Sequence, residues 1–317
     1  MRSTRPFHPF ACAVAALVLL SGGCRPAPPA ALDPGNARPV QAVDTLVAAL
    51  RDDDPRRFAR SALPPELRAR VEAGWRDGRS RWPLEELPLG RQWPRMLATL
   101  SAADAESTLG AAFDRQFAGA DAEIRSAVAT LGLFGMQVVR HDSDYDEAER
   151  DHLAQWVVAL GRWADAAPLA DRERGHAAIA RLVAAARETP LASDAEFGAL
   201  GMDAALAAFG GFTRTLRAVL ADYGLDLGAT LAGLEARLES QTGDRARVRL
   251  RYEIAGTPID GFVDLERRDG HWYVRHLLHH AEATLAAAPP APSPLVGPTA
   301  AGIMPNDAHP TDPVRRR

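Results

Sequence analysis

Residues 247–254 read RVRLRYEI, in which arginine or glutamate alternates with a large apolar side chain at every second position. This period of two predicts a β-strand with one face in the core and one face in water. Residues 259–266, IDGFVDLE, alternate in the same way, and Asp269-Gly270 predicts a tight turn into the run 272–274, WYV. The three runs predict an antiparallel β-meander in which arginines of the first strand face acids of the second.

The chain before this meander has the periodicity of helices. Apolar residues recur at helical spacing throughout residues 41–243. Because a three-stranded meander is not stable alone, these helices are expected to pack on its apolar face. The sequence therefore predicts an α+β fold, a predominantly helical domain (41–243) with a C-terminal three-stranded antiparallel β-meander (244–288).

Four of the predicted helices carry specific expectations. One has a stripe of Leu153, Trp156, Val157, Leu160 and Trp163, which makes both tryptophans expected core residues, and Ser143 is expected to cap it. The helix before it would bury Ile124, Val128, Leu131 and Val138. A capping box at 193–196 begins a long helix that runs on to Tyr223 with a bend or break at Gly210-Gly211, and a last helix with Leu231, Leu234 and Leu238 ends near Gly243.

The first residues of the chain have the pattern of an export signal. Arg2 and Arg5 precede an apolar run at 13–20, AVAALVLL, and small residues then lead to Cys24. A charged start, a short apolar core and small residues before the cut predict a signal peptide at 1–23. The apolar run is too short to cross a bilayer as a helix, and the alternatives are an ordinary secretory signal or an uncleaved anchor.

The segment 21–24, SGGC, resembles the end of a bacterial lipoprotein signal, although the leucine of that pattern stands one position early, at Leu20. The resemblance implies that Cys24 carries acyl chains such as palmitate and becomes the first residue of the mature chain. It implies the periplasmic face of the outer membrane, because Arg25 stands where an aspartate commonly means retention in the inner membrane. Inner-membrane anchoring and secretion to the periplasm are the alternatives.

Both ends of the predicted domain are rich in proline. Residues 24–40 are expected to be a tether between the lipid and the domain, and residues 289–317 a disordered tail. Segments of this composition cannot bury enough apolar surface to offset the entropy lost on ordering.

Composition excludes several classes of chemistry. Cys12 leaves with the signal peptide, so a mature chain starting at Cys24 keeps no free thiol for a disulfide or a nucleophile. All 37 basic residues are arginine, which excludes a Schiff-base lysine and a P-loop. Without the signal peptide, 35 arginines stand against 41 acids, a net charge of −6, so we expect no nucleic-acid partner.

Two clusters contain residue types that bind metal ions. Residues 142–147 place acids at alternate positions, as a calcium loop does, but Glu147 stands where that loop needs glycine, and a helix start explains the acids better. His276, His279 and His280, followed by Glu282, have a spacing that gathers zinc or copper ligands on one helical turn. We expect these histidines to be solvated polar residues where the sheet ends, and we therefore expect no metal and no cofactor.

Catalytic motifs are missing from the sequence. It contains no His-Glu-x-x-His, no Gly-x-Ser-x-Gly and no Gly-x-Gly-x-x-Gly after a strand, so no catalytic residue is predicted.

A second resemblance concerns the two ends of the domain. Residues 46–58 are a predicted helix that ends in an acidic turn, and residues 269–274, DGHWYV, end the predicted meander. Together these two segments look like the N- and C-terminal ends of small secreted nuclear-transport-factor-like domains. The chain is similar too to uncharacterised gamma-proteobacterial lipoproteins, predominantly helical with the same meander. These resemblances imply helices packed on a curved sheet and no particular activity.

These observations favour a non-catalytic scaffold or adaptor, anchored to the membrane through Cys24 and binding another envelope protein. Arg247, Arg249 and Arg251 and the outer strand of the sheet are the expected contact surface. The alternatives are a carrier of an apolar ligand in a helix-lined cavity and, second, a hydrolase or metalloenzyme.

Overall fold

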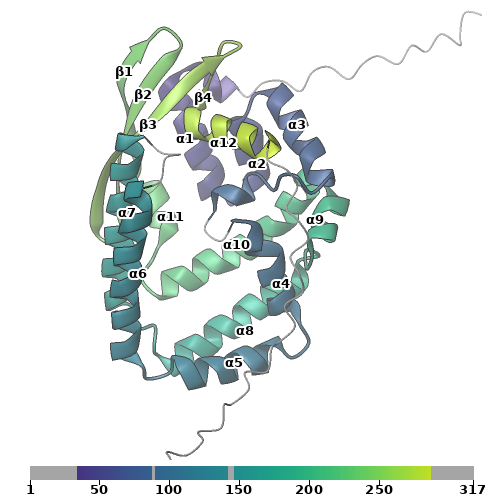
Figure 1. Ribbon diagram of the computed structural model, residues 1–317, viewed down its shortest axis with the longest axis vertical. Helices are drawn as coiled ribbons and strands as arrows, with labels where there is room; N and C mark the ends of the chain where they lie inside the picture. The colour runs from purple at the N-terminus through teal and green to yellow at the C-terminus, as the bar shows by residue number, and fades with distance from the viewer. Residues whose placement is uncertain (1–33, 88–89, 142–145, 287–317) are drawn as a thin grey trace, which may run out of the picture.

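The computed structural model describes residues 34–87, 90–141 and 146–286, and these form the α+β domain that the sequence predicts (Figure 1). The signal peptide, Cys24 and the tail at 289–317 lie outside the described residues. The helical elements are η1 (Pro34–Ala37), α1 (Pro39–Arg51), α2 (Pro55–Ala62), α3 (Pro65–Arg76), η2 (Leu84–Glu86), η3 (Gly90–Gln92), α4 (Trp93–Ser101), α5 (Ala105–Gln116), α6 (Asp121–His141), α7 (Glu147–Ala166), α8 (Arg172–Glu188), α9 (Asp194–Leu200), α10 (Met202–Asp222), α11 (Leu227–Ala232) and α12 (Arg275–Ala286).

The sheet has four antiparallel strands in sequence order, β1 (Glu235–Thr242), β2 (Arg245–Ile254), β3 (Thr257–Arg268) and β4 (His271–Val274). The three predicted strands are confirmed, and so is the expected facing of arginines and acids, since Arg247 pairs with Asp264 and Arg251 with Asp260. The Asp269-Gly270 turn has φ angles of 50° and 81°, as the predicted tight turn requires.

The fourth strand corrects the predicted three-stranded meander and the helix expected up to Gly243. Leu234 and Leu238 fit a helical spacing, but α11 ends at Ala232 and β1 pairs along β2 with a bulge after Leu238. Hydrogen bonding to β2, together with packing of Leu234 and Ala236 against the core, outweighs that weak local preference.

The meander also ends earlier than predicted. Helix α12 begins directly after β4, so residues 275–286 are helical rather than the end of the sheet region. Leu278 and Ala281, three positions apart on α12, are fully buried. This packing turns His276 and His280 toward Glu86 of η2, whereas the sequence predicted solvated side chains, and His279 stays exposed as predicted.

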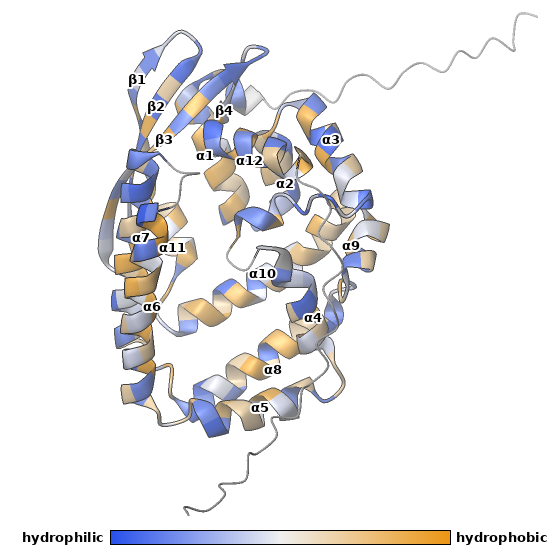
Figure 2. Cartoon of the chain, viewed as in Figure 1, coloured by the Kyte–Doolittle hydropathy of each residue, from blue (hydrophilic) through white to orange (hydrophobic). Residues whose placement is uncertain are grey.

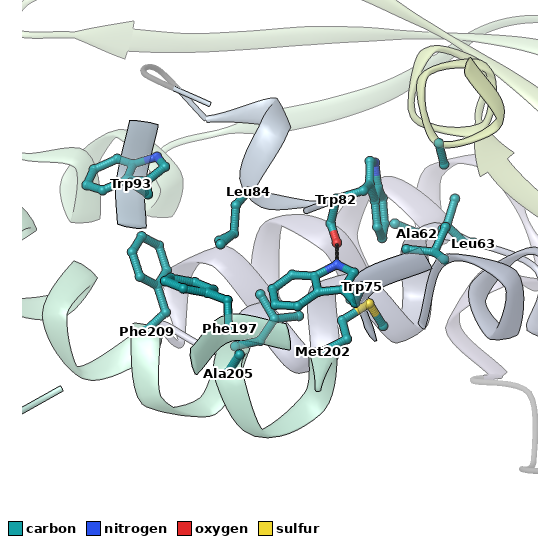
Figure 3. Packing of buried hydrophobic residues seen from close by; sticks show 14 of the residues in the cluster. Ala62, Leu63, Trp75, Trp82, Leu84, Trp93, Phe197, Met202, Ala205 and Phe209 are labelled. Atoms are coloured by element: carbon teal, nitrogen blue, oxygen red, sulfur yellow. Dashed lines mark hydrogen bonds between the residues drawn. The ribbon is translucent and has the colours of Figure 1, made fainter. Parts of the chain in front are cut away.

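One core cluster lies under the first helices and joins both ends of the domain. Trp75, Trp82 and Phe197 are wholly buried there, and the Trp75 indole donates a 2.7 Å hydrogen bond to the carbonyl oxygen of Trp82 (Figure 3). Tyr273 and Leu278, from the last two elements, complete the same cluster. The core under the N-terminal helices is therefore completed by residues from the C-terminal end of the domain.

A second cluster fills the space between the sheet, α1 and α7, where the apolar face of β2 supplies Val248 and Ile254. Trp156 and Trp163 pack against this cluster and are half-buried, which is less than the full burial expected of core residues. Figure 2 shows the alternation of hydrophobic and hydrophilic residues in these elements.

Two helix boundaries differ from prediction. The long helix breaks at Gly201, where φ is +74°, and α10 runs unbroken through Gly210-Gly211. At Gly210 an added Cβ would lie 3.1 Å from the carbonyl oxygen of Asp53, so this glycine permits close packing instead of a bend. Helix α1 begins at Pro39, inside the segment predicted as tether.

Helix α7 is capped by a later residue than predicted. Asp146 and Glu149 form a complete capping box, each side chain accepting a hydrogen bond from the other's backbone N–H. Ser143, the predicted cap, lies outside the described residues. Ser193 caps α9 as expected, although Glu196 accepts from the backbone of Ala192.

Candidate functional site

The strand arginines that were expected to form a contact surface are engaged within the sheet. Arg247 makes a two-pronged ion pair with Asp264 at 2.7 and 2.9 Å, and Arg249 makes another with Asp260 at 2.7 and 2.6 Å. The hydrogen bond from Arg247 holds the pKa of Asp264 below its usual value. These arginines pair with β3, and reversing their charge would disturb the sheet as well as any contact surface.

The four candidate metal ligands of the sequence, His276, His279, His280 and Glu282, all lie on α12, and the structure divides them. His276 and His280 lie one turn apart, and their stacked rings have centroids 5.9 Å from each other. Both side chains approach the carboxylate of Glu86 on η2. One ligand atom from each of the three side chains lies within 4.8 Å of the others. These three residues form the candidate metal centre.

The remaining candidates contact other groups. His279 is 3.9 Å from Glu266 of β3, and its side chain is 58% exposed. Glu282 forms a 2.7 Å ion pair with Arg268. The spacing in the sequence therefore identified the correct helical turn but not the correct set of ligands.

Glu86 was missed by sequence reasoning. It lies 194 positions before His280, and no local pattern in the sequence connects the two. The nearest signal is Trp82, four residues earlier, whose indole nitrogen donates a 2.7 Å hydrogen bond to the Glu86 Oε1 atom. Only the packing of α12 against η2 brings the carboxylate to the histidines.

A different surface feature lies on α6. The sequence predicted that Leu131 and Val138 would be buried, yet both are exposed, and Leu131 and Phe134 are each 66% exposed. The helix turns Ile124 and Val128 toward its neighbour α7, with which it runs side by side in Figure 1. We call the exposed stripe of Ala127, Leu131, Phe134 and Val138 the α6 face.

A third feature is a hollow of about 380 Å³ between α8 and α10. Its lining includes Arg181, Glu188 and Arg214 together with small residues. Such charged walls differ from the apolar, aromatic lining typical of a site for an apolar ligand.

Tyr252, His152 and Trp156 form a polar cluster where α7 meets the sheet. Burial raises the pKa of Tyr252 to about 12 and lowers the pKa of His152. At Gly261 of β3, an added Cβ would lie 2.6 Å from the His152 ring, so the missing side chain lets the imidazole reach the sheet. The cluster joins α7 to β2 and faces the second core, which indicates a structural role.

Within the described residues, no helix combines the length and apolar character that crossing a membrane requires. No family model, no curated protein and no solved structure matches this chain.

Proposed function

We propose that this protein is a lipoprotein, anchored through Cys24 to the periplasmic face of the outer membrane, and that it acts as a non-catalytic adaptor for another envelope protein. The observation that carries the proposal is the α6 face, an apolar stripe that the fold leaves in water. Contiguous exposed apolar surface is uncommon on monomeric proteins and marks contact sites.

The spacing of the α6 face favours a helix as its partner. Ala127, Leu131, Phe134 and Val138 follow one another at intervals of four, three and four residues. This is the seam by which one helix packs along another, with side chains inserted between those of the partner. Residues 127–139, AVATLGLFGMQVV, contain no charge that would oppose burial. The occupant we propose is therefore an amphipathic helix of an envelope protein.

The side chains of the α6 face can bind a partner without disturbing the fold, because they do not hold α6 in place. Helix α6 packs against α7 through its other side, where Val157 of α7 lies 3.6 Å from the position of a Cβ built on Gly135. Burying side chains such as Leu131 and Phe134 in a partner contributes about 1.5–3 kcal/mol each. Replacing them with serine should cost the free protein less than about 0.5 kcal/mol, because exposed positions contribute little to stability.

The test combines site-specific photo-crosslinking with variants of the face. A photoreactive residue at Ala127, an exposed position of the α6 face, is placed in the full chain in intact cells that export it. We expect crosslinking to one defined envelope protein, and loss of this product in Leu131→Ser/Phe134→Ser. The matched control Leu200→Ser, an exposed leucine on α9, should keep it.

Other outcomes would overturn this reading. Crosslinking of the chain only to itself, together with a dimer in sedimentation analysis, would make the α6 face a self-association surface. Binding to lipid vesicles that is lost in Leu131→Ser/Phe134→Ser would make it a lipid-contacting surface. Crosslinking that is unchanged by the two serine substitutions would place the contact elsewhere.

The anchor is tested separately. Cys24→Ser is expected to move the protein from the membrane pellet to the soluble fraction and to remove the mass of the acyl chains. A variant that stays in the pellet with the wild-type mass would show that another segment holds the protein there.

A further inference from the structure

We propose that Glu86, His276 and His280 bind a divalent transition-metal ion of the Zn²⁺ class, which ties α12 to η2. The proposal assigns a ligand to a cluster that the adaptor function does not use. It rests on the positions of three ligand atoms that come from two segments far apart in the sequence, all within 4.8 Å of one another.

The distances suit a small ion. The Nδ1 atom of His280 lies 2.7 Å from Glu86 Oε1, and the Nε2 atom of His276 lies 3.7 Å from Glu86 Oε2. Metal–ligand bonds of about 2.0–2.2 Å in a tetrahedral site place the ligand atoms roughly 3.3–3.6 Å apart. The two observed separations lie on either side of this value, so small side-chain rotations suffice to accept the ion.

The carboxylate is already positioned. Trp82 is wholly buried and donates its indole N–H to Glu86 Oε1, which holds the carboxylate in place. The backbone N–H of Trp82 in turn donates to Ser80 Oγ at 3.1 Å. Outer hydrogen bonds of this kind fix the orientation of metal ligands and raise affinity.

The donor set selects the kind of metal. Two imidazole nitrogens with one carboxylate oxygen suit Zn²⁺, Co²⁺ or Ni²⁺, whereas Mg²⁺ and Ca²⁺ prefer oxygen ligands throughout. The side chains of Glu86, His276 and His280 are 14%, 27% and 34% exposed, so a hydrated ion can reach them from solvent. A water molecule would occupy the fourth position.

The test is a titration of the full chain, without a histidine tag and freed of metal by a chelator, with Zn²⁺ alone. We expect one ion per chain by calorimetry and a higher melting temperature with Zn²⁺, because an ion that binds the folded state stabilises it. His276→Gln, His280→Gln and Glu86→Gln should each weaken binding by at least about tenfold. Glu86→Gln keeps an oxygen that can accept from Trp82.

His279→Gln is the matched control, because His279 lies on the same helix and approaches Glu266 instead. We expect it to bind Zn²⁺ as the wild type does. A second measurement needs no variant, since bound Co²⁺ reports four-coordinate geometry through its visible spectrum. Wild-type protein that takes up neither Zn²⁺ nor Co²⁺, or equal losses in His279→Gln and His280→Gln, would overturn the proposal.

Discussion

The Nε2 atom of His152 on α7 lies 2.6 Å from the hydroxyl oxygen of Tyr252 on β2. The indole nitrogen of Trp156, one turn further along α7, donates to the same hydroxyl. Because an indole can only donate, the hydroxyl accepts from Trp156, and its own O–H is left to donate to His152 in the tautomer whose Nε2 atom carries no proton. One phenol therefore joins two side chains of α7 to the sheet.

Removing that hydroxyl should weaken the junction. Tyr252→Phe is expected to lower the free energy of unfolding by about 1–3 kcal/mol, since it leaves two partly buried groups without their partner. Urea unfolding measures the loss. Tyr223→Phe is the control, because Trp163 contacts Tyr223 through the backbone carbonyl, which the substitution keeps. Equal losses in the two variants would contradict this role for Tyr252.

Alkaline pH should destabilise the protein through the same tyrosine. In the unfolded chain the phenol loses its proton near its ordinary pKa of 10.0, whereas burial keeps Tyr252 protonated up to about 12. The unfolded state therefore binds fewer protons between these two values, and stability falls as pH rises through them. Unfolding free energies measured across this window should fall less steeply in Tyr252→Phe than in the wild type.

Acid should act through His152. Burial lowers its pKa from 6.5, so below that pH the unfolded chain binds more protons than the folded one. Stability contributed by the neutral imidazole is full above pH 6.5 and is lost as pH falls. His152→Gln should show a smaller loss of stability than the wild type between about pH 7 and pH 5.

Two glycines in helices should respond to alanine in opposite ways. At Gly175 of α8 an added Cβ would overlap the Phe113 ring, and Gly175→Ala is expected to cost about 1–3 kcal/mol. At Gly161 of α7 nothing lies within 4 Å of the added atom, and Gly161→Ala should stabilise the protein by about 0.4–1 kcal/mol. Thermal unfolding distinguishes the two, and a stable Gly175→Ala would mean that α5 and α8 can move apart.

The sheet could be predicted because its signals are local and agree with one another. Alternation in residues 247–254 and 259–266 defines the faces, and the opposite charges on the two strands favour their pairing, as Arg247 and Asp264 show. Strand β1 gives no such signal, because residues 235–242 are mostly exposed and their few apolar side chains also fit a helix. Its strand conformation depends on pairing with β2.

The candidate surfaces could be predicted only in part from the sequence. Periodicity revealed that α6 is amphipathic, but it cannot tell whether a partner within the same chain covers Leu131 and Val138. Likewise, the spacing of His276 and His280 pointed to one helical turn, whereas Glu86 joins them only through tertiary packing. Contacts between distant segments depend on how the whole chain packs, and no window of sequence contains that information.

The closure of the first core by β4 and α12 also bears on how fast the protein reaches its fold. Ser80 and Thr284, whose hydroxyls lie 3.5 Å apart in that core, are separated by 204 positions. During synthesis, the apolar surface of α1–α3 stays exposed until nearly the whole domain has been made. Pairings between such distant residues slow folding and prolong exposure to aggregation. We therefore expect a slow, late folding step that depends on residues 271–286.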